Sequence, residues 1–316
     1  MMMMLSNPDP KIFENDAQQL RECLKGKQDK EEGIINITLK YTKRDRQGLK
    51  EMYKTCFGRD LQEDLAKELG GNFKETMVAL YDSPPVYDAK CLYKAMKGLG
   101  TDEDTLIEII CTRPNFVLKQ IKEEFKKLYN KELEKWVEKE TSGDLKKILI
   151  SLLQCNRSEN PRPNEEECKK TAEEIFKNGE GRLGTDETLF RKVFAISSPA
   201  ELYSINKHYI DLTTRGLKAA VEKEFSGDIK KALQTILDGI ICPSEYFANR
   251  VNKAVKGLGT NDKMLVRVLV SREEIDIPQM RVHYKTIGNK EMVDDVVDDT
   301  SGMYQKILKS ICEKNY

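Results

Sequence analysis

The sequence lacks an excess of charge of either sign. Its 316 residues include 53 Lys and Arg and 53 Asp and Glu, which gives a formal charge of zero at pH 7. A strongly basic chain could bind nucleic acid or an anionic membrane through its charge alone. We therefore expect no nucleic-acid partner, and any attraction to an anionic surface needs another source.

Clustered metal ligands and catalytic motifs are also missing. The eight cysteines are scattered without a C-x-x-C pair, and His208 and His283 are the two histidines. This pattern argues against zinc and iron–sulfur centres, which need closely spaced ligands. There is no P-loop, dinucleotide fingerprint, nucleophile elbow, H-E-x-x-H or EF-hand loop, so we expect no enzymatic activity.

Long apolar runs are absent as well. No window of about eighteen apolar residues could span a membrane, and the run that opens "MMMMLSNPDP" is too short for a signal peptide. We therefore expect a soluble, reduced protein with a cytoplasmic location.

What the sequence does have is internal repetition. "KGLGT" occurs at 97–101 and again at 256–260, and "GRLGT" stands at 181–185. An acidic residue before a "TSG" or "FSG" triplet follows each loop. The separation from the last loop glycine to this acid is always 40 positions, from Gly100 to Glu140, from Gly184 to Glu224 and from Gly259 to Asp299.

A fourth, degenerate copy precedes these three. One period further back, 25–29 falls on the loop and Glu68 falls on the acid. This copy keeps Gly26 but has Gln28 where the others have glycine. A residue other than glycine adopts positive φ only at a cost, so we expect this loop to differ from the others.

Between these landmarks the apolar spacing is helical. In the second copy it predicts five short helices that bury one face each, and Thr101 and Ser142 are predicted N-caps. The predicted buried residues are Leu92, Ala95, Met96, Leu106, Ile109, Ile110, Ile121, Phe125, Leu128, Leu133, Trp136, Val137, Leu145, Ile148, Leu149 and Leu152. The expected all-α organisation is an N-terminal tail (1–10), repeat I (11–81), repeat II (88–154), a linker (155–166), repeat III (167–238) and repeat IV (246–316).

Two interpretations of the loops stay open at this point. Gly98 and Gly100 could simply end a helix, with Glu140 as a solvated residue. Alternatively, the loop carbonyls and the distant carboxylate could bind calcium, which takes six to eight oxygen ligands. Capping alone gives no reason for a constant spacing in three copies, so we favour the cation.

With these motifs the chain resembles an annexin over nearly its whole length. The resemblance rests on four repeats of about seventy residues, the "KGLGTDE" loops, the acid 40 positions later and "CTR" at 111–113. The family's arginine position is filled by Arg113 and Arg272, but by Tyr41 in the first copy and Ser197 in the third. The resemblance implies a curved disc of four five-helix repeats that binds calcium on its convex face and docks there on acidic phospholipid.

The same resemblance implies which residues bind calcium. The main sites would use the carbonyls of Met96, Gly98 and Gly100 with Glu140, those of Gly179, Arg182 and Gly184 with Glu224, and those of Val255, Gly257 and Gly259 with Asp299. Secondary positions would be Thr101 with Glu103, Thr185 with Glu187, and Thr260 with Asp262. We expect the site of repeat I to be weak or empty despite Glu68.

Calcium would give a neutral chain its affinity for an anionic surface. Three ions would add about six positive charges. The leucines at the loop tips either make a small local contact or insert into the membrane interface beside basic residues. These membrane-facing candidates are Lys97, Leu99, Arg182, Leu183, Lys256 and Leu258.

Calcium-dependent binding to acidic phospholipid, phosphatidylserine included, is therefore the expected function, reversibly at the inner face of membranes. The alternative is a helical-repeat scaffold that binds cytoskeletal or other protein partners with weak or no calcium dependence. Both share one fold and differ only at the sites.

Overall fold

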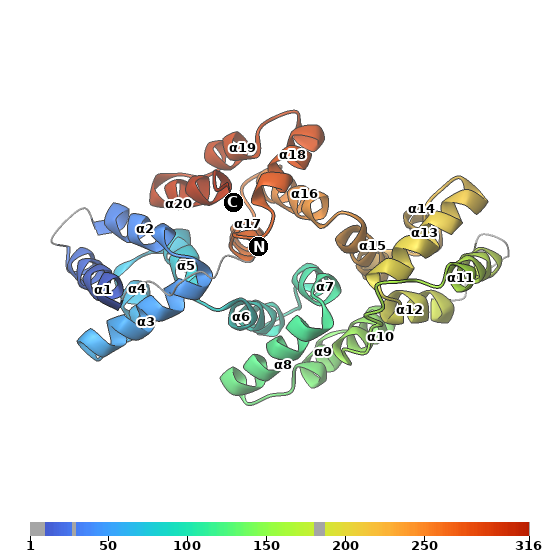
Figure 1. Ribbon diagram of the computed structural model, residues 1–316, viewed down its shortest axis with the longest axis horizontal. Helices are drawn as coiled ribbons and strands as arrows, with labels where there is room; N and C mark the ends of the chain where they lie inside the picture. The colour runs from blue at the N-terminus through green and yellow to red at the C-terminus, as the bar shows by residue number, and fades with distance from the viewer. Residues whose placement is uncertain (1–9, 27–29, 180–186, 316) are drawn as a thin grey trace. The chain divides into compact units, whose positions relative to one another are not determined.

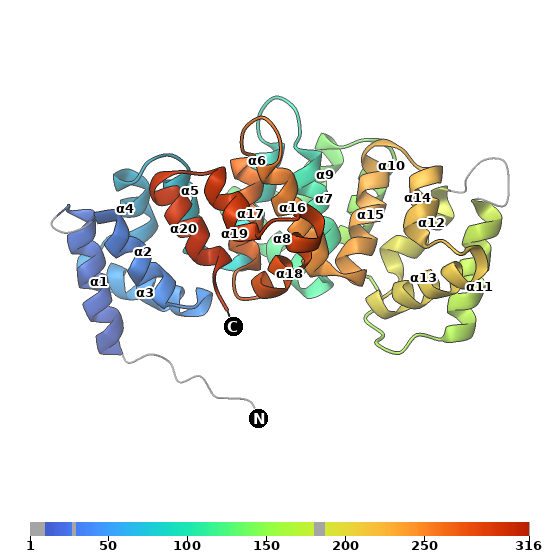
Figure 2. The same ribbon diagram turned by 90° about the horizontal axis from the view of Figure 1, so that it is seen from above.

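All regular elements in the described part of the protein are α-helices. The computed structural model describes residues 10–26, 30–179 and 187–315, and the twenty helices in this part of the chain form four groups of five (Figure 1, Figure 2). The predicted all-α fold of four five-helix repeats is confirmed. Within the same described ranges, no helix is both long and apolar enough to cross a membrane.

The chain divides into two compact units, which are described separately. Unit 1 comprises Met1–Tyr87 and Phe247–Tyr316, and unit 2 comprises Asp88–Tyr246. The helices of repeats I and IV are α1 (Pro10–Leu24), α2 (Lys30–Lys40), α3 (Lys43–Phe57), α4 (Leu61–Glu68), α5 (Gly71–Leu80), α16 (Pro243–Val255), α17 (Asp262–Arg272), α18 (Ile277–Gly288), α19 (Met292–Asp298) and α20 (Gly302–Cys312). Those of repeats II and III are α6 (Pro84–Met96), α7 (Glu103–Thr112), α8 (Asn115–Tyr129), α9 (Leu133–Glu140), α10 (Gly143–Leu153), α11 (Glu165–Asn178), α12 (Glu187–Ile196), α13 (Pro199–Thr213), α14 (Leu217–Glu224) and α15 (Gly227–Ile241).

Unit 2 has one apolar core shared by its two repeats. Helix α15 packs on α7, and α10 packs against α7, α12 and α15. The residues predicted to be buried in repeat II lie in this core, with two exceptions. Trp136 is partly buried, and Leu128, in the last turn of α8, is 43% exposed. A single exposed leucine is common on a protein surface.

The structure corrects the predicted cap at Thr101. Asp102 is the N-cap of α7, because its side chain accepts a hydrogen bond of 3.0 Å from the backbone N–H of Thr105. The Thr101 hydroxyl instead donates to the carbonyl oxygen of Glu140 at 3.2 Å. Ser142 does occupy the N-cap of α10, although its side chain makes no capping bond.

The departure at Tyr41 is compensated within repeat I. In repeat II, Arg113 donates to both carboxylate oxygens of Asp88 on α6, at 2.7 and 3.0 Å. In repeat I, the Tyr41 hydroxyl donates to Asp16 on α1 at 2.5 Å. The phenol of Tyr41 thus links the first two helices of repeat I, whereas the guanidinium of Arg113 makes this link in repeat II.

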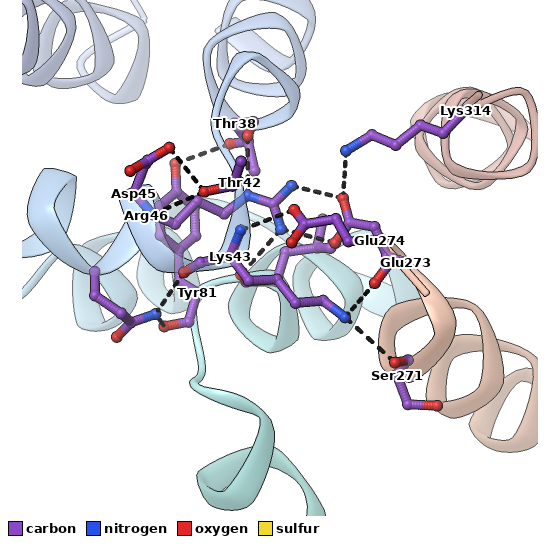
Figure 3. Close-up of polar contacts among 12 residues, drawn as sticks. Thr38, Thr42, Lys43, Asp45, Arg46, Tyr81, Ser271, Glu273, Glu274 and Lys314 are labelled. Atoms are coloured by element: carbon purple, nitrogen blue, oxygen red, sulfur yellow. Dashed lines mark hydrogen bonds and ion pairs between the residues drawn. The ribbon is translucent and has the colours of Figure 1, made fainter. Parts of the chain in front are cut away.

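A buried ion pair joins repeats I and IV inside unit 1. Helix α5 packs on α17 and α20, and nearby Arg46 donates to both carboxylate oxygens of Glu273, at 2.6 and 2.8 Å (Figure 3). Both side chains are 0% exposed. Lys314 donates to the same carboxylate at 2.6 Å, and Lys43 donates to the Glu273 carbonyl at 2.6 Å. Two cations therefore neutralise one buried carboxylate.

Candidate metal site

The glycine loops of repeats II and IV are closed by equivalent hydrogen bonds. The N–H of Asp102 donates to the carbonyl of Ala95 at 2.9 Å, and the N–H of Asn261 donates to the carbonyl of Ala254 at 2.8 Å. Each bond holds the end of the loop against the last turn of the preceding helix. The two loops therefore have matching anchors.

Positive φ explains the glycines in these loops. Gly98 and Gly100 have φ of 120° and 83°, and Gly257 and Gly259 have φ of 133° and 84°. A side chain at such angles would be strained, so these turns favour glycine. In repeat I, Gly26 also has positive φ, whereas Gln28 lies outside the described residues.

The loop tips project into solvent. Leu99 and Leu258 are 108% and 109% exposed, so neither side chain is covered by the protein. A local packing contact therefore does not account for them. Apolar residues at such tips are suited to a contact outside the chain.

The structure brings each of these loops to its distant acid. Thr101 donates from its hydroxyl to the carbonyl of Glu140 at 3.2 Å, and Thr260 does the same to Asp299 at 2.8 Å. The 40 positions are thus the length of chain that leads from the glycine loop back to the loop that carries the acid.

The carbonyls of the predicted loop ligands take no part in the hydrogen bonds that close the loops. In the described part of the chain, no backbone hydrogen bond outside the helices uses the carbonyls of the predicted ligands Met96, Gly98, Gly100, Val255, Gly257 and Gly259. Backbone carbonyl oxygens are among the ligands that calcium takes from loops.

The two acids differ in their surroundings. Oδ2 of Asp299 is buried and has no hydrogen-bond partner among the described residues. An unpartnered buried carboxylate oxygen is costly and rare in folded proteins, and a cation would remove that cost. Glu140 is more open, since its side chain is 22% exposed and lies 3.3 Å from the ammonium of Lys139.

Beside Glu140 lies an acidic pocket of about 250 Å³ in unit 2. It is lined by the secondary-site residue Glu103 together with Glu140, Asp144 and Asp228. In repeat IV the corresponding secondary acid is Asp262, the first residue of α17.

Repeat III is only partly described. The predicted residues Arg182, Leu183, Gly184 and Thr185 lie outside the described residues. Gly179 is buried with φ of −120°, and the Glu224 side chain is 12% exposed, 3.8 Å from Lys223. A hydrogen bond with Asp144 raises the pKa of the secondary-site residue Glu187.

Repeat I contains a feature that motif analysis missed. Glu68 lies 3.3 Å from the ammonium of Lys30. Lys30 falls at the position that Asp102 and Asn261 occupy in repeats II and IV. A lysine therefore contacts the acid of repeat I from within the chain.

Four five-helix repeats, two of which hold a glycine loop against the loop of a distant acid, define a helical-repeat protein. The annexin family model matches four segments, at residues 15–80, 87–152, 170–236 and 246–311. The chain belongs to the annexin family.

The relatives agree with this assignment over almost the full chain. Human annexin A13 is 40% identical over 306 residues, which cover 97% of each protein. The solved structure of annexin III has a TM-score of 0.92 at 33% identity and covers 96% of this chain and 94% of its own. A structure described as calcium-bound annexin (Sm)1 has a TM-score of 0.87 at 30% identity, with 96% and 91% covered.

Family membership fixes the general class of activity. Annexins as a family bind phospholipid membranes in a calcium-dependent manner, and they are in general not enzymes. Calcium binding is likewise a property of the family.

Proposed function

We propose that this chain binds acidic phospholipid membranes, phosphatidylserine included, through calcium held by repeats II, III and IV. The observation that carries the proposal is the pairing of each described glycine loop with its acid, at Thr101 with Glu140 and at Thr260 with Asp299. The unpartnered Oδ2 of Asp299 supports it further, because calcium prefers oxygen ligands.

The donor set fits a hard cation. In repeat II the ligands would be the carbonyls of Met96, Gly98 and Gly100 with the carboxylate of Glu140, and in repeat IV those of Val255, Gly257 and Gly259 with Asp299. Repeat III would use Gly179, Arg182 and Gly184 with Glu224. Thr101, Glu103, Thr185, Glu187, Thr260 and Asp262 would serve secondary positions, and Glu68 would contribute little because Lys30 contacts it.

Few protein ligands per ion leave positions for outside oxygens. A phosphate oxygen from a lipid would fill such a position, so calcium and lipid must raise each other's affinity by the same factor. Without lipid, the dissociation constant for calcium should be that of weak calcium-binding modules, roughly 10⁻⁴ to 10⁻³ M. The bound calcium supplies the positive charge that the neutral chain lacks.

The loop tips add contacts of their own. Leu99 and Leu258 would enter the interfacial region of the bilayer, and Leu183 would do so in repeat III. Lys97, Lys256 and Arg182 would lie near headgroup phosphates. The proposed location is the cytoplasm, with reversible attachment to the inner face of membranes, where anionic lipids are enriched.

Cosedimentation with vesicles across a calcium titration tests the proposal. The wild-type chain should pellet reversibly with phosphatidylserine vesicles, and neither with pure phosphatidylcholine nor in the presence of chelator. The double variant Glu140→Gln with Asp299→Asn should need far more calcium. Glu68→Gln is the matched control, because it neutralises the equivalent acid of repeat I, and its calcium requirement should be that of the wild type.

Two results would overturn the proposal. No pelleting at millimolar calcium would favour the helical-repeat scaffold with protein partners. An unchanged calcium requirement in the double variant would remove the proposed ligands.

A further inference from the structure

Among the described residues of repeat IV, two of the buried polar atoms without a hydrogen-bond partner lie around the junction of α19 and α20. One is Oδ2 of Asp299, at the end of α19, and the other is the phenolic oxygen of Tyr304 on α20. Helices α19 and α17 both pack against α20. Unpartnered buried polar atoms are rare in folded proteins, and a cluster of two calls for a physical explanation.

The Tyr304 hydroxyl interacts electrostatically with two carboxylates. Burial raises the pKa of Tyr304, and the carboxylates of Asp262 and Asp299 raise it further. A phenol carries one hydroxyl proton that it can donate to an acceptor. Asp262 is close to this hydroxyl but outside hydrogen-bonding geometry.

A hydroxyl at this position distinguishes repeat IV from the other copies. Tyr304 stands five positions after Asp299, where repeats II and III have Leu145 and Ile229. Both of these apolar residues line the acidic pocket beside Glu140. Repeat II thus has open space next to Glu103 and Glu140, whereas repeat IV has a buried donor near Asp262 and Asp299.

We propose that Tyr304 is a positioning residue of the repeat IV calcium site, which donates its hydrogen bond to Asp262 when the ion binds. This inference rests on the proposed function. Calcium at the main position would occupy the Asp299 oxygen, and calcium at the secondary position would fix Asp262 so that the Tyr304 hydroxyl would gain an acceptor. The apolar Leu145 gives repeat II no such bond, so repeat IV should bind calcium more tightly than repeat II in the absence of lipid.

Tyr304→Phe tests the inference by calorimetric calcium titration without lipid. The variant should lose about tenfold in affinity at one class of site, which is the loss expected for one hydrogen bond to a charged group. Without calcium, its Tm should equal or exceed that of the wild type, because the lost hydroxyl had no partner. The calcium-induced rise in Tm should shrink.

Tyr284→Phe is the matched control in the same unit. The Tyr284 hydroxyl donates to Asp295 at 2.7 Å, so its loss should lower the Tm without calcium and leave calcium affinity unchanged. Unchanged calcium affinity in Tyr304→Phe would overturn the inference, and so would a Tm loss like that of Tyr284→Phe. If the wild-type chain itself bound no calcium, the proposed function would fail together with this inference. Binding lost in Asp299→Asn but kept in Tyr304→Phe would overturn the inference alone.

Discussion

Thr260 donates a hydrogen bond of 2.8 Å to the carbonyl oxygen of Asp299, which lies 39 positions later in the chain. The bond fixes the glycine loop of repeat IV against the loop that carries its acid. The backbone of Asp299 is thereby held against the end of the glycine loop. Helices α17, α18 and α19 span the distance between the two loops, which explains why the separation is constant between copies.

We predict that Thr260→Val weakens calcium-dependent membrane binding. Loss of this bond should loosen the two loops and cost about 1 kcal/mol, or roughly a fivefold increase in the calcium needed for half-maximal vesicle binding. Thr260→Ser keeps the hydroxyl and should stay close to the wild type. Equal effects of the valine and serine variants in the cosedimentation assay would contradict a role for the hydrogen bond.

The exposed loop leucines should contribute to membrane binding and not to calcium affinity. In the double variant Leu99→Ser with Leu258→Ser, we expect weaker vesicle binding at saturating calcium, because about 25 cal/mol is lost for each Å² of apolar surface that no longer enters the interface. Calorimetric calcium affinity without lipid should be unchanged. Val282→Ser, at another exposed apolar position (68%), on α18, serves as a control and should bind like the wild type. A loss of calcium affinity without lipid would contradict this separation.

Much of the fold could be predicted because helices bury residues at regular intervals. The pattern in repeat II indicated its buried residues, and it failed at Leu128, where the spacing continues into the last turn of α8 but burial does not. The cap at Thr101 was wrong for a different reason. Thr101 and Asp102 are both good N-caps, and the tertiary bond from Thr101 to Glu140 decides between them.

The candidate site was less predictable where its residues lie outside the repeated motif. The constant spacing indicated that Gly100 and Glu140 act together. In the structure, the loop that contains Gly100 lies beside Glu140. Lys30 and Tyr304 interrupt the repetition, so only a position-by-position comparison of the four copies could have found them. Arg46 and Glu273 are 227 positions apart, and no local pattern indicates such a pair.

Leu106→Ala should affect stability and leave calcium dependence unchanged. Leu106 is 0% exposed in the core of unit 2, and truncation of a buried leucine costs about 2–5 kcal/mol in the free energy of unfolding. Chemical denaturation would measure this loss. Leu128→Ala is the exposed control, with an expected change within about 0.5 kcal/mol. A similar cost for both variants would contradict the burial of Leu106.

The ion pair between Arg46 and Glu273 should make unit 1 sensitive to acid. Burial by itself would raise the pKa of Glu273, but the hydrogen bonds and charges of Arg46 and Lys314 hold it at about 2, below the ordinary value of 4.5. A depressed carboxyl pKa contributes stability that is fully present above pH 4.5 and is lost as the pH falls toward 2. Glu273→Gln should therefore be destabilised at neutral pH by about 3–5 kcal/mol, because Arg46 is left buried and unpaired.

Chemical denaturation at a series of pH values would test this dependence. The difference in unfolding free energy between the wild type and Glu273→Gln should shrink as the pH falls below 4.5, since protonation removes the same charge from the wild type. The double variant Arg46→Met with Glu273→Met removes both charges and should lose much less stability than Glu273→Gln. A difference that stayed constant down to pH 2 would mean that the two side chains contribute through packing, because only the charged pair titrates in that range.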